Sequence, residues 1–235
     1  MTAPRLAIVG AGRMGAAVRA LASERGWPVA AEIGRGGNAG GAAITRERLA
    51  GADVAIEFTT PDAAPDNAIA CARAGMPVVV GTTGWLARQA EVEAAVRESD
   101  GALFWAPNFS LGVNVFWRVA ERAAALMATL PGFDAHVLES HHVAKRDAPS
   151  GTALETARRM DASRPPTSAP VPIHSVRLPG LYAHQEVLFS GPGELLTLRH
   201  DLFSPQAFAP GIVAALRYAA KARGMARGIE HAFAG

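Results

Sequence analysis

The sequence that decides the fold is LAIVGAGRMG, residues 6–15. Its first four residues form a continuous apolar run, which is typical of a strand buried on both faces of a parallel sheet. The three glycines match the pattern G-x-G-x-x-G, and apolar residues at helical spacing follow as far as Gly26, where a helix would end. A strand, a glycine turn and a helix in this order predict a dinucleotide-binding turn. A tight turn that binds no ligand is the alternative.

The alternation of strand and helix continues through the first part of the chain. We expect further strands at residues 28–33, 54–58, 77–80 and 102–105, and helices at 62–75 and 86–98. Asp62 is preferred to Thr60 as the N-cap of the first of these helices, because it places Pro65 in the first turn. The glycine-rich connection 34–41 is interpreted as a mobile loop. The repeated βαβ pattern predicts an α/β fold with a Rossmann-type doubly wound parallel sheet.

The pattern changes in the second half of the chain. We expect helices at 111–130, 152–160 and 211–222, and strands at 133–139, 173–178, 186–189 and 195–199. Thr152 and Glu155 suggest a capping box at the start of the middle helix. The short strands predict an α+β domain with a mixed, mostly antiparallel sheet. With the last helix packed on the first domain, the predicted domains are 1–107 with 208–235, and 108–207.

Composition limits the class of protein. Of 235 residues, 49% are apolar and 19% are charged, which suits a packed core and excludes disorder for most of the chain. The net charge of +2 is too small for a nucleic-acid footprint. The single cysteine, Cys71, excludes an intramolecular disulfide and fits a reducing compartment. Neither a signal pattern nor a long apolar run is present, so we expect a cytoplasmic protein without membrane partners.

The densest polar segment is ESHHVAKRDAPSGT, residues 139–152. A histidine can transfer a proton near neutral pH, and Lys145 adds positive charge for an anionic substrate. The Ser-Gly-Thr start of a helix can bind a carboxylate through backbone N–H groups. The adjacent histidines could form a metal pair, but no third ligand stands at metal spacing, so no metal is expected. A purely structural loop is the other alternative.

Five parts of the sequence resemble the 4-hydroxy-tetrahydrodipicolinate reductases, also called dihydrodipicolinate reductases. They are the glycine turn at 10–15, GTTGW at 81–85, APNFSLGVN at 106–114, the segment 139–153, and the later stretches at 177–180, 186–189 and 198–201. The resemblance implies reduction of 4-hydroxy-tetrahydrodipicolinate, a cyclic imine with two carboxylates, to tetrahydrodipicolinate by hydride from NADPH or NADH. It also implies a place in lysine and diaminopimelate biosynthesis, and a homotetramer assembled through the sheets of the second domain.

The resemblance further implies roles for individual residues. His141 is expected to be the general acid/base, and Lys145 the proton donor that also holds the substrate. The substrate carboxylates are expected on His142, Gly151 and Thr152. Cofactor contacts are expected from Gly10, Ala11, Gly12, Arg13, Met14, Gly81, Thr82, Thr83, Ala106, Pro107, Asn108 and Phe109, with Phe58 and Thr59 lining the same site. Two other functions stay open: a nicotinamide-dependent reductase of another small carboxylated substrate, and a nucleotide sensor, which has no need for proton donors.

The end of the second strand is expected to select the cofactor. Glu32 could accept the ribose hydroxyls of NAD, whereas Arg35 could bind the 2′-phosphate of NADP; solvated surface charges are the alternative for both. This chain departs from the family by a glycine turn one residue shorter. It also has Gly34 before Arg35, where the family often has an acid. The missing acid leaves Arg35 for a 2′-phosphate, so we expect a preference for NADPH.

Overall fold

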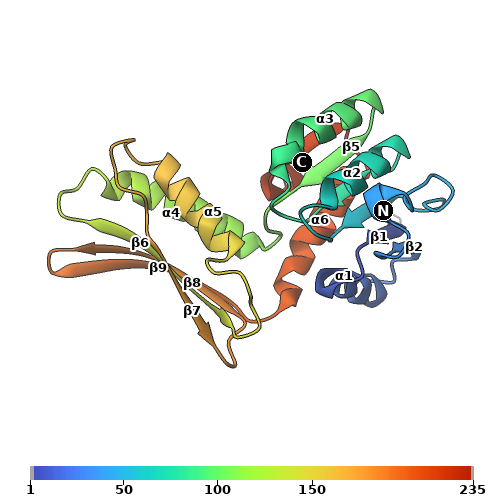
Figure 1. The fold of residues 1–235 in the computed structure, drawn as a ribbon. Coiled ribbons are helices and arrows are strands. Elements are labelled where there is room, and N and C mark those ends of the chain that lie inside the picture. Colours follow the sequence, from blue (N-terminus) through green and yellow to red (C-terminus); the bar gives the residue numbers. More distant parts are fainter. Residues whose placement is uncertain (1–2, 234–235) are drawn as a thin grey trace. The chain divides into compact units, whose positions relative to one another are not determined.

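The computed structural model describes residues 3–233 and divides into two compact units. The first unit joins the residues up to Phe109 with those from Phe208 onward, and the second runs from Ser110 to Ala207. Each unit is a sheet with helices packed against it (Figure 1). In the part of the chain that the structure describes, no helix has the length and apolarity needed to cross a membrane.

The first unit contains a six-stranded sheet in the order β10-β5-β4-β3-β1-β2, and every neighbouring pair is parallel. Its strands are β1 (Leu6–Val9), β2 (Val29–Ile33), β3 (Val54–Glu57), β4 (Val78–Val80), β5 (Ala102–Trp105) and β10 (Gly224–Arg227). The order reverses between β1 and β3, which makes this a doubly wound sheet. In such sheets, ligands bind outside the carboxyl ends of the strands at the reversal.

Helices cover both faces of this sheet, as Figure 1 shows. They are α1 (Arg13–Glu24), α2 (Ala64–Arg73), α3 (Gln89–Glu98) and α6 (Ala209–Ala219), with short 3₁₀ helices at Ala39–Gly41, Leu86–Arg88, Pro205–Phe208 and Ile229–Phe233. Val78 and Val80 pack in one core with α2 and α3, whereas Phe104 meets Tyr218 of α6 with ring centroids 5.5 Å apart. Burial on both faces explains why β4 and β5 consist only of apolar residues.

The second unit contains the sheet β7-β6-β8-β9 and two helices. The elements are α4 (Leu111–Met127), β6 (Asp134–His142), α5 (Gly151–Ala162), β7 (Ile173–Leu178), β8 (Ala183–Gly191) and β9 (Glu194–Leu202). The β6–β7 pair is parallel and the other two pairs are antiparallel, so the predicted mixed sheet is confirmed. Trp117 of α4 lies in the core of this unit and donates to the hydroxyl of Thr156 on α5 at 2.8 Å.

Two predicted helix caps are wrong. Asp62 does not cap α2, because the backbone N–H groups of Ala63 and Ala64 both bond to the carbonyl of Thr60 and leave Asp62 inside the preceding turn. The capping box of Thr152 and Glu155 is also absent. Ser150 caps α5 through a hydrogen bond from the backbone N–H of Ala153 at 3.2 Å, whereas Glu155 binds Arg158 and Arg159. In each case the helix begins at a different residue from the one predicted.

The C-terminal strand β10 was missed by the sequence prediction. Its residues, GMAR, include neither a β-branched nor an aromatic side chain, so local propensity gives no strand signal. Pairing with β5 makes this segment a strand, and α6 ends at Ala219 rather than at 222. The predicted helix at 111–130 likewise ends earlier, at Met127, and the hairpin strands β8 and β9 are longer than predicted.

The turn between β1 and α1 depends on glycine at two of its three positions. Gly10 has φ +113°, and a Cβ there would lie 2.0 Å from the carbonyl oxygen of Phe58. A Cβ on Gly15 would lie 1.9 Å from the carbonyl oxygen of Gly10. A Cβ on Gly12 would meet no atom within 4 Å. The fold therefore requires the first and third glycines, whereas the second leaves the backbone open to a ligand.

We predict that Gly15→Ala lowers the free energy of unfolding by about 2 kcal/mol, because the added methyl group forces α1 away from the turn. Urea unfolding followed by circular dichroism measures this change. The matched control is Gly12→Ala, which places the same group in open space and is expected to cost less than about 1 kcal/mol. Equal losses in the two variants would contradict the steric explanation.

Candidate active site

Phe58, directly after β3, joins three loops at the carboxyl edge of the parallel sheet. Its carbonyl lies against Gly10, and its ring occupies the space beside Gly81, where a Cβ would come within 2.0 Å of it. The ring also meets the ring of Phe109 edge-on, with centroids 5.9 Å apart. The structure thus brings together the glycine turn, the 81–83 loop and the 106–109 segment, which lie far apart in sequence.

The predicted cofactor residues differ in how far they are exposed to solvent. Thr82 is buried, and its hydroxyl accepts a hydrogen bond from the backbone N–H of Thr59 at 2.8 Å. The carbonyl of Thr82 accepts one from the indole of Trp105 at 3.0 Å, so this residue joins the loops. Ala106 and Phe109 are also buried. The exposed residues of the set are Ala11, Gly12, Arg13, Arg35 and Thr83, with Met14, Gly81, Pro107 and Asn108 half-buried.

The N-terminus of α1 fits the pyrophosphate of a dinucleotide. No side chain caps the helix at Gly12, and its first turn contains no acidic residue. The first N–H groups of a helix have no partner within the helix, and the helix dipole favours an anion beside them. Because a Cβ at Gly12 would occupy open space, its absence lets a phosphate approach the backbone.

The two charged residues predicted to select the cofactor lie in different settings. Glu32 is within β2, and Arg19 of α1 binds both of its carboxylate oxygens, one of them from Nε at 2.6 Å. Arg19 lowers the pKa of Glu32 through this hydrogen bond. Arg35 follows β2 and is exposed. The carboxylate of Glu32 is therefore already engaged, whereas the guanidinium of Arg35 reaches solvent.

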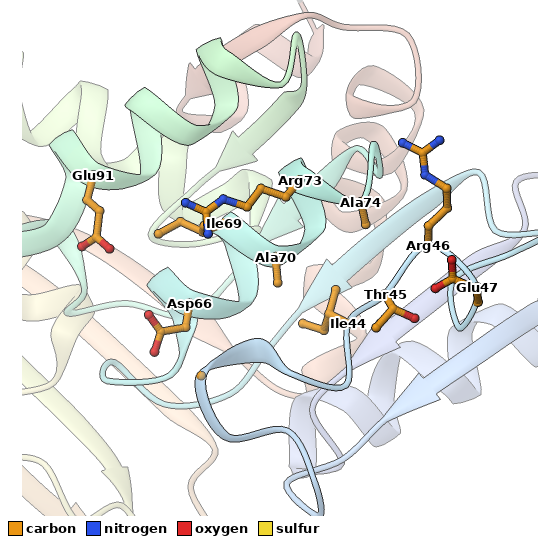
Figure 2. Close-up of a pocket in the computed structure, with 11 residues that line it drawn as sticks. Ile44, Thr45, Arg46, Glu47, Asp66, Ile69, Ala70, Arg73, Ala74 and Glu91 are labelled. Atoms are coloured by element: carbon orange, nitrogen blue, oxygen red, sulfur yellow. The ribbon is translucent and has the colours of Figure 1, made fainter.

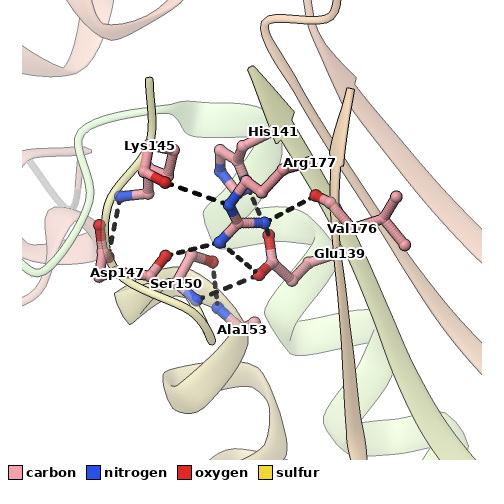
Figure 3. A network of polar contacts seen from close by, with 8 residues as sticks. All are labelled: Glu139, His141, Lys145, Asp147, Ser150, Ala153, Val176 and Arg177. Atoms are coloured by element: carbon pink, nitrogen blue, oxygen red, sulfur yellow. Dashed lines mark hydrogen bonds and ion pairs between the residues drawn. The ribbon is translucent and has the colours of Figure 1, made fainter. Parts of the chain in front are cut away.

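The predicted substrate residues lie at the end of β6 and the start of α5. His141 and His142 are the last residues of β6, and Gly151 and Thr152 are the first of α5. Lys145 lies between the two elements, and its Nζ is 2.9 Å from a carboxylate oxygen of Asp147 (Figure 3). Burial opposes ionisation of Asp147, but the hydrogen bond and positive charge of Lys145 lower its pKa. The lysine is thus positioned to hold a carboxylate.

Glu139 is the centre of this polar cluster, although its side chain is fully buried. Arg177 of β7 binds its two carboxylate oxygens at 3.0 and 3.1 Å. The Nδ1 atom of His141 contacts one oxygen, and the backbone N–H of Ser150 donates to the other at 3.3 Å (Figure 3). The same carboxylate therefore contacts the predicted general acid/base and the first residue of the helix cap.

The charges of Glu139 and His141 determine which nitrogen of the His141 ring can exchange a proton. Burial favours the neutral acid of Glu139, yet hydrogen bonds from Arg177, Ser175 and His141 lower its pKa, so it is a carboxylate. Burial lowers the pKa of His141, and the charge of Glu139 acts in the opposite direction. A carboxylate at Nδ1 makes that nitrogen the donor and leaves Nε2 to exchange protons.

Arg177 also holds the loop that carries Lys145. Its Nε donates to the carbonyl of Lys145 at 3.3 Å, and Nη2 donates to the carbonyl of Asp147 at 2.5 Å. The start of the loop is held as well, because the backbone N–H of Lys145 donates to the carbonyl of His142 at 3.0 Å. One guanidinium therefore connects the buried Glu139 with the backbone of the lysine loop.

Among residues 3–233, the structure contains no group of three or more histidine, cysteine, aspartate or glutamate side chains that could hold a metal ion. The lone thiol, Cys71, is buried, and burial raises its pKa to about 12.

A surface cavity of about 470 Å³ lies between residues 40–47 and α2 (Figure 2). Its charged lining residues are Arg46, Glu47, Asp66, Arg73 and Glu91. The predicted cofactor residues do not line it, and its charges are of both signs. We therefore assign no ligand to this cavity.

Family models match both halves of the chain. One described as "Dihydrodipicolinate reductase, N-terminus" covers residues 4–109, and one described as "Dihydrodipicolinate reductase, C-terminus" covers residues 112–232. The chain belongs to the dihydrodipicolinate reductase family. It is an oxidoreductase, as the resemblance of the sequence predicted.

Individual relatives of the reductase agree over nearly its full length. It is 40% identical to the 4-hydroxy-tetrahydrodipicolinate reductase of Streptomyces coelicolor, with 98% of each chain covered. It is 38% identical to that of Streptomyces griseus, again with 98% of each covered. The dipicolinate-bound dihydrodipicolinate reductase from Paenisporosarcina sp. TG-14 superimposes with a TM-score of 0.76 at 29% identity, covering 97% of this chain and 99% of that one.

Sequence reasoning missed Glu139 and Arg177 as functional residues of the reductase. A signal for Glu139 was available, because alternate residues of a strand share a face and Glu139 therefore lies on the same face as His141. Arg177 is 38 residues beyond Glu139, and only the parallel pairing of β6 with β7 sets it opposite His141. That pairing has no local sequence signature.

We predict that Glu139→Gln lowers the pKa of His141 further, because the variant removes the negative charge that favours the imidazolium. Titration of the histidine resonances by NMR measures this value. The control is Glu186→Gln, which removes a carboxylate that lies beside His184 and leaves the pKa of His141 as it is. A His141 pKa that stays constant or rises in Glu139→Gln would show that the carboxylate does not support the imidazolium.

Proposed function

We propose that the two units of the reductase divide the reaction between them, the first holding the dinucleotide and the second the substrate. The chain reduces 4-hydroxy-tetrahydrodipicolinate to tetrahydrodipicolinate with NAD(P)H, in diaminopimelate and lysine biosynthesis. The observation that carries the division of roles is the cluster of His141, Lys145 and Glu139 at the start of α5, in the second unit.

Substrate binding is proposed to depend on attraction between the positive charge of this cluster and the carboxylates of the substrate. The substrate is a ring with two carboxylates, and the Paenisporosarcina relative is described with dipicolinate, a ring of the same kind. Lys145 supplies a positive charge, and its ammonium lies 2.9 Å from a carboxylate oxygen of Asp147, the kind of group that the substrate carries. Gly151 and Thr152 contribute the N-terminal end of α5, which favours an anion, and His142 lies beside them in sequence.

Proton transfer is assigned to His141. Glu139 fixes the imidazole through Nδ1, so Nε2 is the atom that delivers or takes the proton. Lys145 provides a second proton donor and keeps the substrate in the orientation needed for reaction. When bound, the nicotinamide would supply a hydride to one carbon of the ring, and the residues of this chain would protonate the electron-rich centre that develops elsewhere in the ring, with the 4-hydroxyl group leaving as water.

The dinucleotide would be held by the loops at the carboxyl edge of the parallel sheet. Those loops are Gly10–Met14, Gly81–Thr83 and Ala106–Phe109, which Phe58 connects. Arg35 is proposed to bind the 2′-phosphate of NADPH, because Arg19 already engages the one acidic residue near the end of β2, Glu32. Arg35 is expected to favour NADPH over NADH, because no acidic residue beside it in the described part of the chain is free to bind the ribose hydroxyls of NADH.

We predict that kcat/KM with NADPH exceeds that with NADH by about threefold to tenfold, the range expected for one ordinary hydrogen-bonding contact at an exposed site. The assay follows nicotinamide oxidation, with substrate generated by the preceding synthase. Arg35→Ala is expected to remove most of the difference. A kcat/KM with NADH equal to or above that with NADPH would contradict the preference, and a chain inactive with both cofactors would contradict the function.

We predict that His141→Gln lowers kcat by about 100-fold or more and leaves the KM of the substrate within a few-fold, because the variant removes proton transfer but keeps the shape of the site. Lys145→Ala is expected to raise KM and lower kcat together, because the lysine acts in both binding and protonation. Initial rates over a range of substrate concentrations separate the two patterns. Wild-type kcat in His141→Gln, or an effect of Lys145→Ala confined to cofactor affinity, would overturn these roles.

A homotetramer is proposed to form through the sheet of the second unit. Helices α4 and α5 pack on the face that carries Val137 and Phe189. The opposite face carries Val176 and Leu195, which are 37% and 59% exposed. Exposed apolar side chains of this kind leave water when a second copy covers the face, which also carries charged residues such as Glu186 and Arg199. We also propose that the enzyme acts in the cytoplasm, where its free thiol is stable.

We predict that Val176→Glu lowers the mass measured by sedimentation equilibrium from that of a tetramer to that of a smaller species, because it replaces an apolar side chain of the proposed interface with a charged one. Leu126→Glu is the control, since Leu126 is also exposed, 52% against 37% for Val176, but lies on α4, on the other side of the sheet. A tetramer that persists in Val176→Glu would place the interface elsewhere.

A further inference from the structure

Asn67 of α2 is a buried amide that uses both of its polar atoms. Its Oδ1 accepts a hydrogen bond from Nδ2 of Asn38 at 2.9 Å. Its Nδ2 faces the hydroxyl of Thr59 at 3.2 Å and a carboxylate oxygen of Glu57 at 3.4 Å. Asn67 is only 1% exposed, and Glu57 is fully buried. Because a buried polar group without partners is costly, these hydrogen bonds fix the position of the Asn67 side chain.

Asn38 connects this buried amide to the loop after β2. Its backbone N–H donates to the carbonyl of Arg35 at 3.3 Å and closes a four-residue turn, in which Gly37 has φ +72°. Its Oδ1 accepts from the backbone N–H of Ala43 at 3.1 Å. A few residues on, a Cβ at Gly41 would lie 2.8 Å from a carbonyl of α2, so the loop packs tightly on that helix. Asn38 therefore holds the turn that begins at Arg35.

The other end of the chain of hydrogen bonds reaches the loop after β4. The hydroxyl of Thr59 donates to Glu57, and the backbone N–H of Thr59 donates to the hydroxyl of Thr82 at 2.8 Å. The path thus runs from Thr82 through Thr59 and Asn67 to Asn38 and the Arg35 turn. It crosses α2 and connects two loops from which the sequence analysis expects cofactor contacts.

We infer that Asn38 and Asn67 are positioning residues for cofactor selection, which hold the Arg35 turn in the arrangement that binds the 2′-phosphate of NADPH. This inference rests on the proposed role of Arg35. An exposed turn that is held in advance loses little conformational freedom when it binds a phosphate, whereas a loose turn must be ordered by the ligand. NADH has no 2′-phosphate, so its binding does not depend on that order.

The test measures kcat/KM with NADPH and with NADH for the unaltered enzyme, Asn38→Ala, Arg35→Ala and the double variant. Asn38→Ala is expected to lower the ratio of the two values by about threefold to tenfold, as for the loss of one or two hydrogen bonds. In the Arg35→Ala background the same change is expected to leave the ratio as it is, because the two residues act as a unit. Fluorescence titration with NADPH checks that the change lies in binding.

Two further variants complete the design. Thr45→Ala is a control in the same connection between β2 and β3. It removes the hydrogen bond that the Thr45 hydroxyl accepts from the backbone N–H of Arg48, and it is expected to leave the ratio of kcat/KM with NADPH to that with NADH unchanged. Asn67→Ala removes the residue at the centre of this chain of hydrogen bonds. Like Asn38→Ala, it is expected to lower the ratio of kcat/KM with NADPH to that with NADH. If Asn67→Ala does not fold, Asn38→Ala decides the question alone, because Asn38 is only half-buried.

The outcomes separate this inference from the proposed function. An unchanged ratio in Asn38→Ala, or an equal fall with both cofactors, would show that Asn38 is merely structural and would overturn the inference. A fall in the ratio that persists in the Arg35→Ala background would overturn it as well, because Asn38 would then act by another route. If Arg35→Ala itself leaves the ratio unchanged, the proposed role of Arg35 is refuted. That result does not depend on any of the asparagine variants.

Discussion

The close approach of two backbones at the carboxyl edge of the parallel sheet is the constraint on which the first unit depends. Gly10 passes the carbonyl of Phe58 at a distance that leaves no room for a side chain. This contact sets where Phe58 lies, and the ring of Phe58 then fills the space beside Gly81 and meets Phe109. Three loops are therefore positioned by one residue, because each packs on a different part of it.

In the second unit, the arrangement of the site depends on the buried carboxylate of Glu139. A carboxylate removed from water is costly unless it is paired and hydrogen-bonded. Glu139 meets this requirement with Arg177, His141 and the backbone of Ser150. The same contacts orient the imidazole and attach the lysine loop, so the arrangement of the candidate active site follows from satisfying that charge. Removing Arg177 would take two hydrogen bonds from the carboxylate and two from the loop.

The two kinds of constraint differ in how far local sequence reveals them. The glycine turn was predicted because the residues that form it are adjacent and each glycine has its own steric reason. The strands β1 and β5 were predicted with their observed bounds, because uniformly apolar runs indicate burial on both faces. The caps of α2 and α5 were placed wrongly, since several polar residues compete near each helix start and backbone turns decide among them. β10 was missed because only its neighbour β5 makes it a strand.

The sequence alone determined the doubly wound sheet, the glycine turn and the histidine segment, because each is encoded by residues close together whose periodicity or spacing carries the physical signal. It also supplied the family, since the motifs extend over most of the chain. Only the tertiary structure decided which distant residues meet: Arg177 with Glu139, Phe58 with Gly81, and Asn38 with Asn67. Those contacts arise from strand order and packing between elements, for which a single sequence has no local code.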